Sequence, residues 1–278
     1  MSYQKEQMVD LILDKLTEKF DSLREQYFQE NDVTKTKFFY VDDLLPVDLA
    51  EKIFLAFPEK SEKWRRLTSF RENKCTSKSF DDFDSILRDI TFAFQDNSVI
   101  QMIEKITEIP NLCGDDTLYA GGLSMMSEGH FLNPHIDNSH NQDRTLYRRA
   151  NLLFYVTPEW KLENGGNIEL WNTDVSKNLT IESKFNRLVV METNDKSWHS
   201  VSKVVAQGRR CCVSNYYFSE TSPKQKDYFH ITAFNGRPTE KLKRLQCFAD
   251  NLLRTSVRKV LKKGIGKKDL YKSDDKQV

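Results

Sequence analysis

Between residues 3 and 106, most segments show the hydrophobic and polar pattern of helices. Apolar side chains recur there mostly at spacings of three and four, with charged residues between them, which is typical of amphipathic helices. Residues 61–82 break the pattern because they are polar and rich in Lys, Arg and Ser, and we expect an exposed connection. A short strand is expected at residues 38–41. The expected helices span residues 3–30, 46–57, 83–94 and 99–106.

From Thr117 onward the pattern changes to short apolar runs separated by loops. Many short strands with turn signals between them are typical of a sandwich or a barrel. Asn164-Gly165-Gly166 is expected to form a hairpin turn, because glycine supplies the positive φ that a tight turn needs. The expected strands span residues 118–126, 150–157, 167–171, 179–181, 187–191, 200–204 and 210–218.

A basic segment follows the strands. Residues 241–261 carry large apolar side chains at helical spacing, and the chain from Asn251 onward has nine Lys and Arg against three Asp. We expect a helix that packs on the barrel through this apolar stripe. The alternative is that the basic helix and tail contact nucleic acid or an anionic membrane surface.

The composition fits one large domain with extensions, since the chain has 278 residues of which 38% are apolar. Charged residues make up 30%, but the net charge is only +1, so the overall charge indicates no particular partner. The five cysteines show no CxxC spacing, and an odd number indicates free thiols in a reducing compartment. No stretch approaches the roughly 18 apolar residues of a membrane span, and no signal peptide is recognisable. We therefore expect a cytoplasmic protein.

A His-x-Asp motif carries the first indication of chemistry. In an extended segment His135 and Asp137 share a face, because side chains alternate at period two. If His199 from a distant strand joins them, the three form a two-His, one-carboxylate facial triad that binds Fe(II) and leaves coordination positions open. The alternative is a pair of surface or hydrogen-bonded histidines near an acid.

Arg210 strengthens the metal-site interpretation. It opens a strand in which Arg210, Cys212, Ser214 and Tyr216 share a face, whereas Arg209 would point the other way. A guanidinium pointing into a barrel is costly unless it meets an anion, and its planar fork matches a carboxylate. Arg210 is therefore a candidate anchor for an acidic cosubstrate.

Taken together and in this order, these motifs resemble the prolyl-4-hydroxylase-like branch of the 2-oxoglutarate/Fe(II)-dependent dioxygenases. The resemblance covers about residues 116–220 and is strongest to the hypoxia-factor prolyl hydroxylases. It rests on His135-Ile136-Asp137, the aromatic strand Leu152–Tyr155 with Trp160, the Gly165-Gly166 pair, His199 and Arg210.

The resemblance implies an α+β fold with a mainly β core, a double-stranded β-helix (jelly roll) with N-terminal supporting helices and a basic C-terminal helix. His135, Asp137 and His199 would bind Fe(II), and Arg210 would bind 2-oxoglutarate. Tyr155 lies where the family places a tyrosine that supports the cosubstrate, and Asn151 and Ser214 are further cofactor-binding candidates on inward-facing positions. We expect the chain to divide into four regions: an N-terminal helix at residues 1–34, a helical support region at 35–115, the dioxygenase core at 116–220 and a basic helical extension at 221–278.

The implied reaction is hydroxylation of an unactivated C–H bond, with O2 as oxidant and succinate and CO2 as co-products. Ascorbate as a reductant is implied by the family alone. A carboxylate at Asp137 favours hydroxylation over halogenation, because a halide would need that coordination position. The substrate is left open between a prolyl residue of a protein and a small metabolite or sugar. The polar segment 138–149, with Arg144, Arg148 and Arg149, is a candidate for selecting it.

Two other classes remain as alternatives. A cupin-type metalloenzyme that does not use 2-oxoglutarate would share the barrel and the triad but leave Arg210 unexplained. A non-catalytic jelly-roll binding module would have no need of the metal ligands. His130 and His140 flank the motif, but neither lies at i, i+2 from an acid on a plausible strand, and we interpret both as loop residues.

Overall fold

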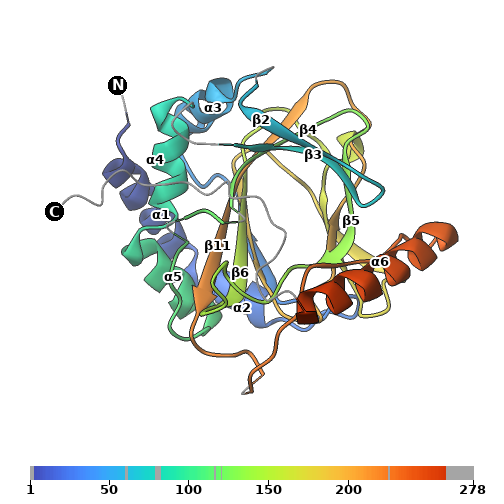
Figure 1. Cartoon of the computed structure of the whole chain (residues 1–278). Coiled ribbons are helices and arrows are strands. Elements are labelled where there is room, and N and C mark those ends of the chain that lie inside the picture. Colours follow the sequence, from blue (N-terminus) through green and yellow to red (C-terminus); the bar gives the residue numbers. More distant parts are fainter. Residues whose placement is uncertain are drawn as a thin grey trace.

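A curled antiparallel sheet with helices stacked on one face forms the body of the molecule (Figure 1). The computed structural model describes residues 3–59, 62–78, 83–115, 117–119, 121–224 and 226–260. The predicted double-stranded β-helix with N-terminal helices and a C-terminal helix is confirmed. The strands are β1 Phe38–Val41, β2 Trp64–Thr68, β3 Glu72–Ser77, β4 Gly122–Ser127, β5 Phe131–Ile136, β6 Tyr147–Tyr155, β7 Ile168–Trp171, β8 Asn178–Ile181, β9 Arg187–Glu192, β10 His199–Val201, β11 Arg209–Ser219 and β12 Ala233–Phe234.

Strand order explains how distant segments meet at one cavity. The strands run β1-β9-β6-β11-β4-β3-β5-β10-β7-β8, with β2 paired to β3 and β12 paired to β5. The strand β3 therefore joins the half that contains β6 and β11 to the half that contains β5 and β10. Because the sheet curls into a barrel, the inner faces of the two halves face each other across its interior (Figure 1).

Alternation along the central strands separates the barrel interior from the face that the helices cover. In β6, Leu152 and Phe154 belong to the cluster shared with the helices, whereas Tyr155 belongs to the cluster inside the barrel. In β11, Val213 faces the helices and Cys212 faces inward. The predicted period-two pattern thus decides which side chains reach the cavity.

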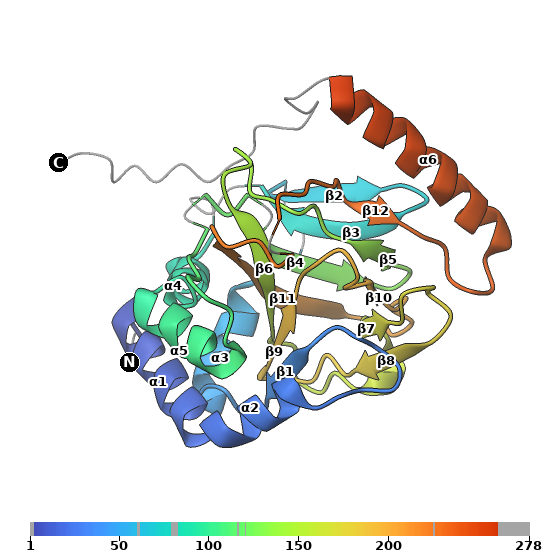
Figure 2. The same ribbon diagram turned by 90° about the horizontal axis from the view of Figure 1, so that it is seen from below.

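Five helices cover the outer face of the β6 and β11 half (Figure 2). The single helix predicted for residues 3–30 is interrupted at Lys19, whose φ of −101° and ψ of 5° leave the helical region. The first part packs on α4 and α5, whereas the second packs on α5 and β1. The helices are α1 Lys5–Glu18, α2 Phe20–Phe28, α3 Val47–Ala56, α4 Ser85–Ala93 and α5 Asn97–Thr107.

The prediction of an exposed connection at residues 61–82 is wrong. The hairpin of β2 and β3 occupies most of this segment and extends the sheet through pairing with β4 and β5. Its strands carry no hydrophobic alternation because most of their side chains are only half-buried. One apolar anchor, Trp64, stacks on Phe57 with ring centroids 6.2 Å apart.

The prediction of a hairpin at Gly165-Gly166 is also wrong, although both glycines have the expected positive φ, +74° and +71°. The strand β6 pairs with β9 and β11, whereas β7 pairs with β8 and β10. The loop therefore crosses from one half of the barrel to the other, and residues 162–164 form a single 3-10 turn within it.

The C-terminal helix α6, Lys241–Val260, is present but presents an unexpected face to the barrel. Its buried contact is Cys247, whereas most of the predicted apolar stripe is exposed to solvent. The expectation that the stripe packs on the barrel is therefore wrong for its members up to Val257. Leu261 and the basic tail 261–278 lie outside the described residues. No helix in the described part of the chain is long and apolar enough to cross a bilayer.

Candidate active site

Two adjacent strands bring the predicted metal ligands together. His135 on β5 and His199 on β10 occupy opposing positions of an antiparallel pair, and Asp137 follows directly after β5. Asp137 Oδ1 lies 3.6 Å from His135 Nε2, and Asp137 Oδ2 lies 3.6 Å from His199 Nε2. The three side chains offer ligand atoms that all lie within 4.8 Å of one another, so one metal ion could contact all three.

Backbone hydrogen bonds orient both imidazoles. His135 Nδ1 lies 3.0 Å from the Asn133 carbonyl oxygen, and His199 Nδ1 lies 2.9 Å from that of Ser197. A carbonyl only accepts, so each Nδ1 carries a hydrogen, and in the neutral ring Nε2 is the nitrogen with a lone pair for a metal. Burial lowers the pKa of His135 to about 3, which keeps this ring neutral and able to bind a metal.

Two side chains of β6 hold the Asp137 carboxylate. Asn151 Nδ2 donates a 2.8 Å hydrogen bond to Asp137 Oδ2, and Arg148 Nη1 lies 3.3 Å from the same oxygen. Burial alone would raise the pKa of Asp137, but the charge of Arg148 and the hydrogen bond from Asn151 hold it well below its usual range. The carboxylate is therefore anionic and fixed in orientation.

These contacts change the interpretation of the segment 138–149. Arg148 is 2% exposed and contacts Asp137, so it does not lie in a loop that meets the substrate. Arg149 is also buried and donates to the Thr221 carbonyl oxygen. Arg144 remains in the loop and lies over the ring of Phe229. The three arginines therefore do not form one substrate-facing cluster.

The last strand, β12, supports the metal ligands from outside the predicted core. Phe234 stacks on His135, with ring centroids 5.3 Å apart and an interplanar angle of 19°. Asn251 of α6 holds Phe234 in place, because it accepts from the Phe234 amide at 3.0 Å and donates to its carbonyl at 2.7 Å. The C-terminal segment thus contributes to the site, which the motifs that end near Phe218 gave no reason to expect.

We expect Phe234→Ala to lower stability by about 3 kcal/mol, since it empties a buried aromatic position. Metal affinity should fall by about tenfold because His135 loses the ring that fixes its plane. Urea unfolding and an anaerobic Fe(II) titration measure the two effects. Phe229→Ala is the control, because that ring is 44% exposed and stacks on no metal ligand. Equal metal affinities in the two variants would contradict the role of Phe234.

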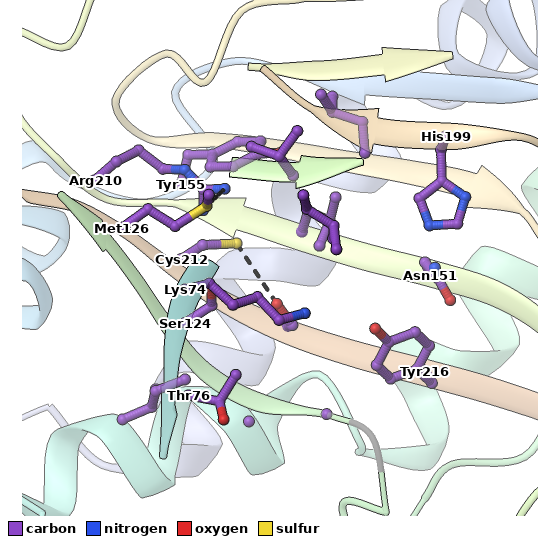
Figure 3. A pocket seen from close by; sticks show the side chains of 18 of the residues that line it. Lys74, Thr76, Ser124, Met126, Asn151, Tyr155, His199, Arg210, Cys212 and Tyr216 are labelled. Carbon is purple, nitrogen blue, oxygen red and sulfur yellow. Dashed lines mark hydrogen bonds between the residues drawn. The ribbon is translucent and has the colours of Figure 1, made fainter. Parts of the chain in front are cut away.

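One cavity joins the triad to the predicted cosubstrate residues (Figure 3). Its wall contains the inward-facing residues of β6 and β11, so the predicted sharing of faces holds for both strands. The two triad histidines come from β5 and β10, and Asp137 follows β5, so strands from both halves of the barrel line the cavity. The lining side chains that belong to the predicted set are His135, Asp137, His199, Arg210, Tyr155, Asn151 and Ser214.

Arg210 is buried with donors left over. The side chain is 3% exposed, its Nε donates to the Gly166 carbonyl at 3.1 Å, and its Nη2 lies 3.3 Å from Met126 Sδ. Among the described residues no carboxylate lies within ion-pair distance of it. A buried guanidinium in this state favours an anionic ligand. Arg209 instead lies on the helix side, where it donates to the Phe57 carbonyl and covers the Phe54 ring.

The other cosubstrate candidates differ in what they contact. Tyr155 is buried beside Arg210, and its hydroxyl makes no hydrogen bond to the described residues. Burial raises the pKa of Tyr155, so its hydroxyl remains a donor. Ser214 Oγ shares a weak 3.7 Å hydrogen bond with Cys212 Sγ, which a ligand oxygen would replace. Asn151 differs from both because its amide contacts Asp137.

Lys74 and Thr76 of β3 line the same cavity and were missed by the sequence analysis. They belong to the hairpin that was mistaken for an exposed connection. Their spacing of two was a usable signal, but only once the segment is known to be a strand. Ser124 and Met126 on β4 were missed as site residues for a different reason, because nothing in their chemistry distinguishes them.

The backbone of the Gly165-Gly166 loop holds Arg210, because the Gly166 carbonyl accepts from its Nε. The same loop leaves no room for a side chain at Gly165. A Cβ on Gly165 would lie 2.0 Å from the Lys203 carbonyl oxygen, whereas a Cβ on Gly129 would meet nothing within 4 Å. Both glycines have positive φ, +74° and +82°. We expect Gly165→Ala to cost at least about 2 kcal/mol more than Gly129→Ala, which carries only the backbone cost of about 1 kcal/mol. Chemical denaturation of both variants tests this; equal losses would contradict it.

The remaining histidines lie outside the triad. His130 follows β4 in a turn and does not line the cavity, as expected for a loop residue. His140 and His230 line a second cavity, next to Tyr147 and Tyr228. Burial lowers the pKa of all three. In the described part of the chain, the triad is the one cluster of His, Cys and acidic side chains able to hold a metal ion.

Comparisons with known proteins agree with this geometry. Residues 121–218 match the model of the 2OG-Fe(II) oxygenase superfamily. The chain is 30% identical over 99 residues to the prolyl 3-hydroxylase OGFOD1 of Xenopus laevis, and 27% identical over 95 residues to that of Mus musculus. Each alignment covers 32% of this chain, but only 19% and 17% of the respective relatives. The chain therefore matches less than a fifth of their length.

Solved structures show the same fold. A prolyl-4-hydroxylase of Pseudomonas putida superimposes with a TM-score of 0.53 at 13% identity, covering 76% of this chain and 98% of that one. A prolyl hydroxylase of Trichoplax adhaerens, solved with a peptide of the hypoxia inducible factor, gives a TM-score of 0.51 at 14% identity, covering 81% and 94%. The segment 121–218 is therefore similar in sequence to the 2OG-Fe(II) oxygenase superfamily, and the chain shares the fold of these prolyl hydroxylases.

Proposed function

We propose that this protein is a 2-oxoglutarate- and Fe(II)-dependent dioxygenase that hydroxylates an unactivated C–H bond, with succinate and CO2 as co-products. One observation carries the proposal. A single cavity contains both a three-ligand metal face and a buried arginine without a carboxylate partner among the described residues. A metal site alone would account for the triad but not for the arginine.

The donor set fits Fe(II). Two imidazole nitrogens and one carboxylate leave coordination positions free for a cosubstrate and for dioxygen. Both histidines are oriented through Nδ1, and Asp137 is fixed by Asn151 and Arg148, so the ligands are arranged before the metal binds. Bound iron would supply dioxygen activation, which these side chains cannot provide themselves.

The opposite end of the cavity fits a dicarboxylate. Arg210 would bind the distal carboxylate of 2-oxoglutarate, and the Tyr155 hydroxyl and Ser214 would add hydrogen bonds. With that end held, the keto-acid end would reach toward the triad, whose His199 lies on the other side of the cavity from Arg210 (Figure 3). Asn151 supports Asp137 and would act on the cosubstrate only through it. Ascorbate would serve as a reductant for oxidised iron.

The metal-binding end and the Arg210 end of the cavity are both buried. His135, His199 and Arg210 are each no more than 5% exposed, so water is largely excluded from the residues that hold the metal and the cosubstrate. Exclusion of water strengthens the Arg210–carboxylate contact and protects a reactive oxidant from side reactions. The proposed catalytic unit is longer than residues 116–220, because β3 and β12 contribute Lys74, Thr76 and Phe234 to the site.

Of the possible substrates, we favour a prolyl residue of a protein over a small metabolite or sugar. The matched curated relatives are prolyl 3-hydroxylases, which supports a prolyl substrate, although the match covers only a small part of them. Incubation with Fe(II), 2-oxoglutarate and heavy-isotope dioxygen tests both classes, against a library of proline-containing peptides and against a metabolite extract. We expect one labelled oxygen atom in a peptide product. Oxygen uptake that does not require 2-oxoglutarate would instead favour the cupin-type enzyme.

A further inference from the structure

The helix α6 packs on the barrel with its polar side. Arg244 donates to the Asp174 and Val175 carbonyl oxygens, Arg254 donates to that of Thr232, and Asp250 forms an ion pair with Arg71. Asn251 makes the two backbone hydrogen bonds to β12 described above. These directional contacts fix the rotation of the helix about its own axis.

The opposite side of α6 is apolar and faces solvent. Its six large side chains are between 46% and 80% exposed, although soluble surfaces rarely gather so many in one patch. The helix lies on the outside of the barrel, on the side away from α1–α5 (Figure 1). We call this surface the α6 face; it consists of Leu242, Leu245, Phe248, Leu252, Leu253 and Val257.

We propose that the α6 face binds an anionic lipid bilayer, with α6 lying in the plane of the membrane surface. An interfacial helix of this kind combines a broad apolar face with basic residues and does not cross the bilayer. The α6 face supplies the apolar part. Directly after it in the sequence, residues 258–268 contain six Lys and Arg and no Asp or Glu, which matches the charge of anionic lipid headgroups.

A second copy of the chain fits this surface less well. A paired helix needs a narrow seam of large apolar residues at alternating spacings of three and four. From Leu242 and Leu245 that seam continues through Ala249, Leu252 and Ser256, so two of its positions are small. Phe248, Leu253 and Val257 lie off the seam and widen the apolar arc, which suits a flat surface. The adjacent basic run would also bring like charges together in a dimer.

Vesicle flotation of the full chain tests the proposal without iron or cosubstrate, so its outcome is independent of the proposed oxygenase activity. We expect binding to vesicles of phosphatidylcholine with phosphatidylserine, weaker binding to phosphatidylcholine alone, and a loss of affinity as salt is raised. Phe248→Ser/Leu252→Ser should weaken binding by at least about tenfold. Leu55→Ser is the matched control, because Leu55 is 72% exposed on α3 in the helical layer, away from α6, and should change nothing.

A fluorescence measurement covers the case in which the double variant folds poorly. Leu253→Trp should shift its emission to the blue when phosphatidylserine vesicles are added, whereas Leu55→Trp should not. No binding by the wild-type chain, or binding that the α6 variants leave unchanged, would overturn the proposal. A chain that binds duplex nucleic acid but not vesicles would overturn it as well, as would a dimer in light scattering that Phe248→Ser/Leu252→Ser dissociates without any vesicle binding.

Discussion

Arg210→Ala should raise the KM for 2-oxoglutarate by two orders of magnitude or more while leaving Fe(II) affinity nearly unchanged. Arg210 is buried, and a cosubstrate carboxylate would be its charge-assisted partner. Loss of one side of a buried charged pair costs about 3–5 kcal/mol, which is about two to four orders of magnitude in affinity. Initial rates of 2-oxoglutarate consumption over a range of concentrations measure the effect.

Two variants control for charge and for position. Arg210→Lys should recover part of the loss, because it restores the charge but not the planar fork. Arg209→Ala should leave the KM unchanged, since Arg209 faces the helices and contacts Phe57 and Phe54. It should lower stability by about 1 kcal/mol instead. A raised KM in Arg209→Ala with a normal KM in Arg210→Ala would contradict the assignment.

Asp137→Ala should abolish turnover and weaken Fe(II) binding by more than about a hundredfold, because Asp137 is the one anionic ligand of the triad. It should also destabilise the fold by about 3 kcal/mol, since the buried Arg148 loses its carboxylate partner. Anaerobic metal titration and urea unfolding separate the two effects, because the metal is titrated only under conditions in which the variant is folded.

His140→Ala is the control for Asp137→Ala. His140 lies in the same stretch of chain but lines the second cavity, so its loss should leave metal affinity and turnover close to those of the wild type. An inactive but folded His140→Ala protein would show that the metal ligands are wrongly chosen. Wild-type succinate formation by Asp137→Ala would lead to the same conclusion.

Period-two alternation allowed much of the cavity to be predicted from the sequence. Because alternate residues of a strand face the same side, one inward residue such as Arg210 or Tyr155 determines the others on that strand. The His-x-Asp motif worked for the same reason, since both ligands extend from one short segment. Its partner His199 lies far away in sequence, and it could be chosen only through the family pattern.

Contacts between distant segments could not be predicted in this way. Arg148 appeared as one of three arginines in a polar stretch, and its pairing with Asp137 depends on how β6 lies beside the end of β5. Lys74 was hidden because β3 is half-buried and lacks hydrophobic alternation. Phe234 reaches His135 only because two residues of the C-terminal segment pair with β5.

The orientation of α6 shows a further limit of sequence patterns. An apolar stripe at helical spacing predicts a helix, and burial of that stripe is the usual expectation. Here hydrogen bonds from Arg244, Asn251 and Arg254 to backbone groups hold the polar side inward instead. The periodicity is the same in both orientations, so only the structure could distinguish them.

Succinate formation from 2-oxoglutarate is the most direct test of the central claim. The folded protein should be incubated in air with Fe(II) and 2-oxoglutarate, even without a substrate, because uncoupled turnover is sufficient. We predict succinate and CO2 in equal amounts, with both lost when Fe(II) or dioxygen is omitted and in Asp137→Ala, and both greatly reduced in Arg210→Ala at low 2-oxoglutarate. If the iron-loaded wild-type protein leaves 2-oxoglutarate unchanged, with and without the peptide library, the account is contradicted.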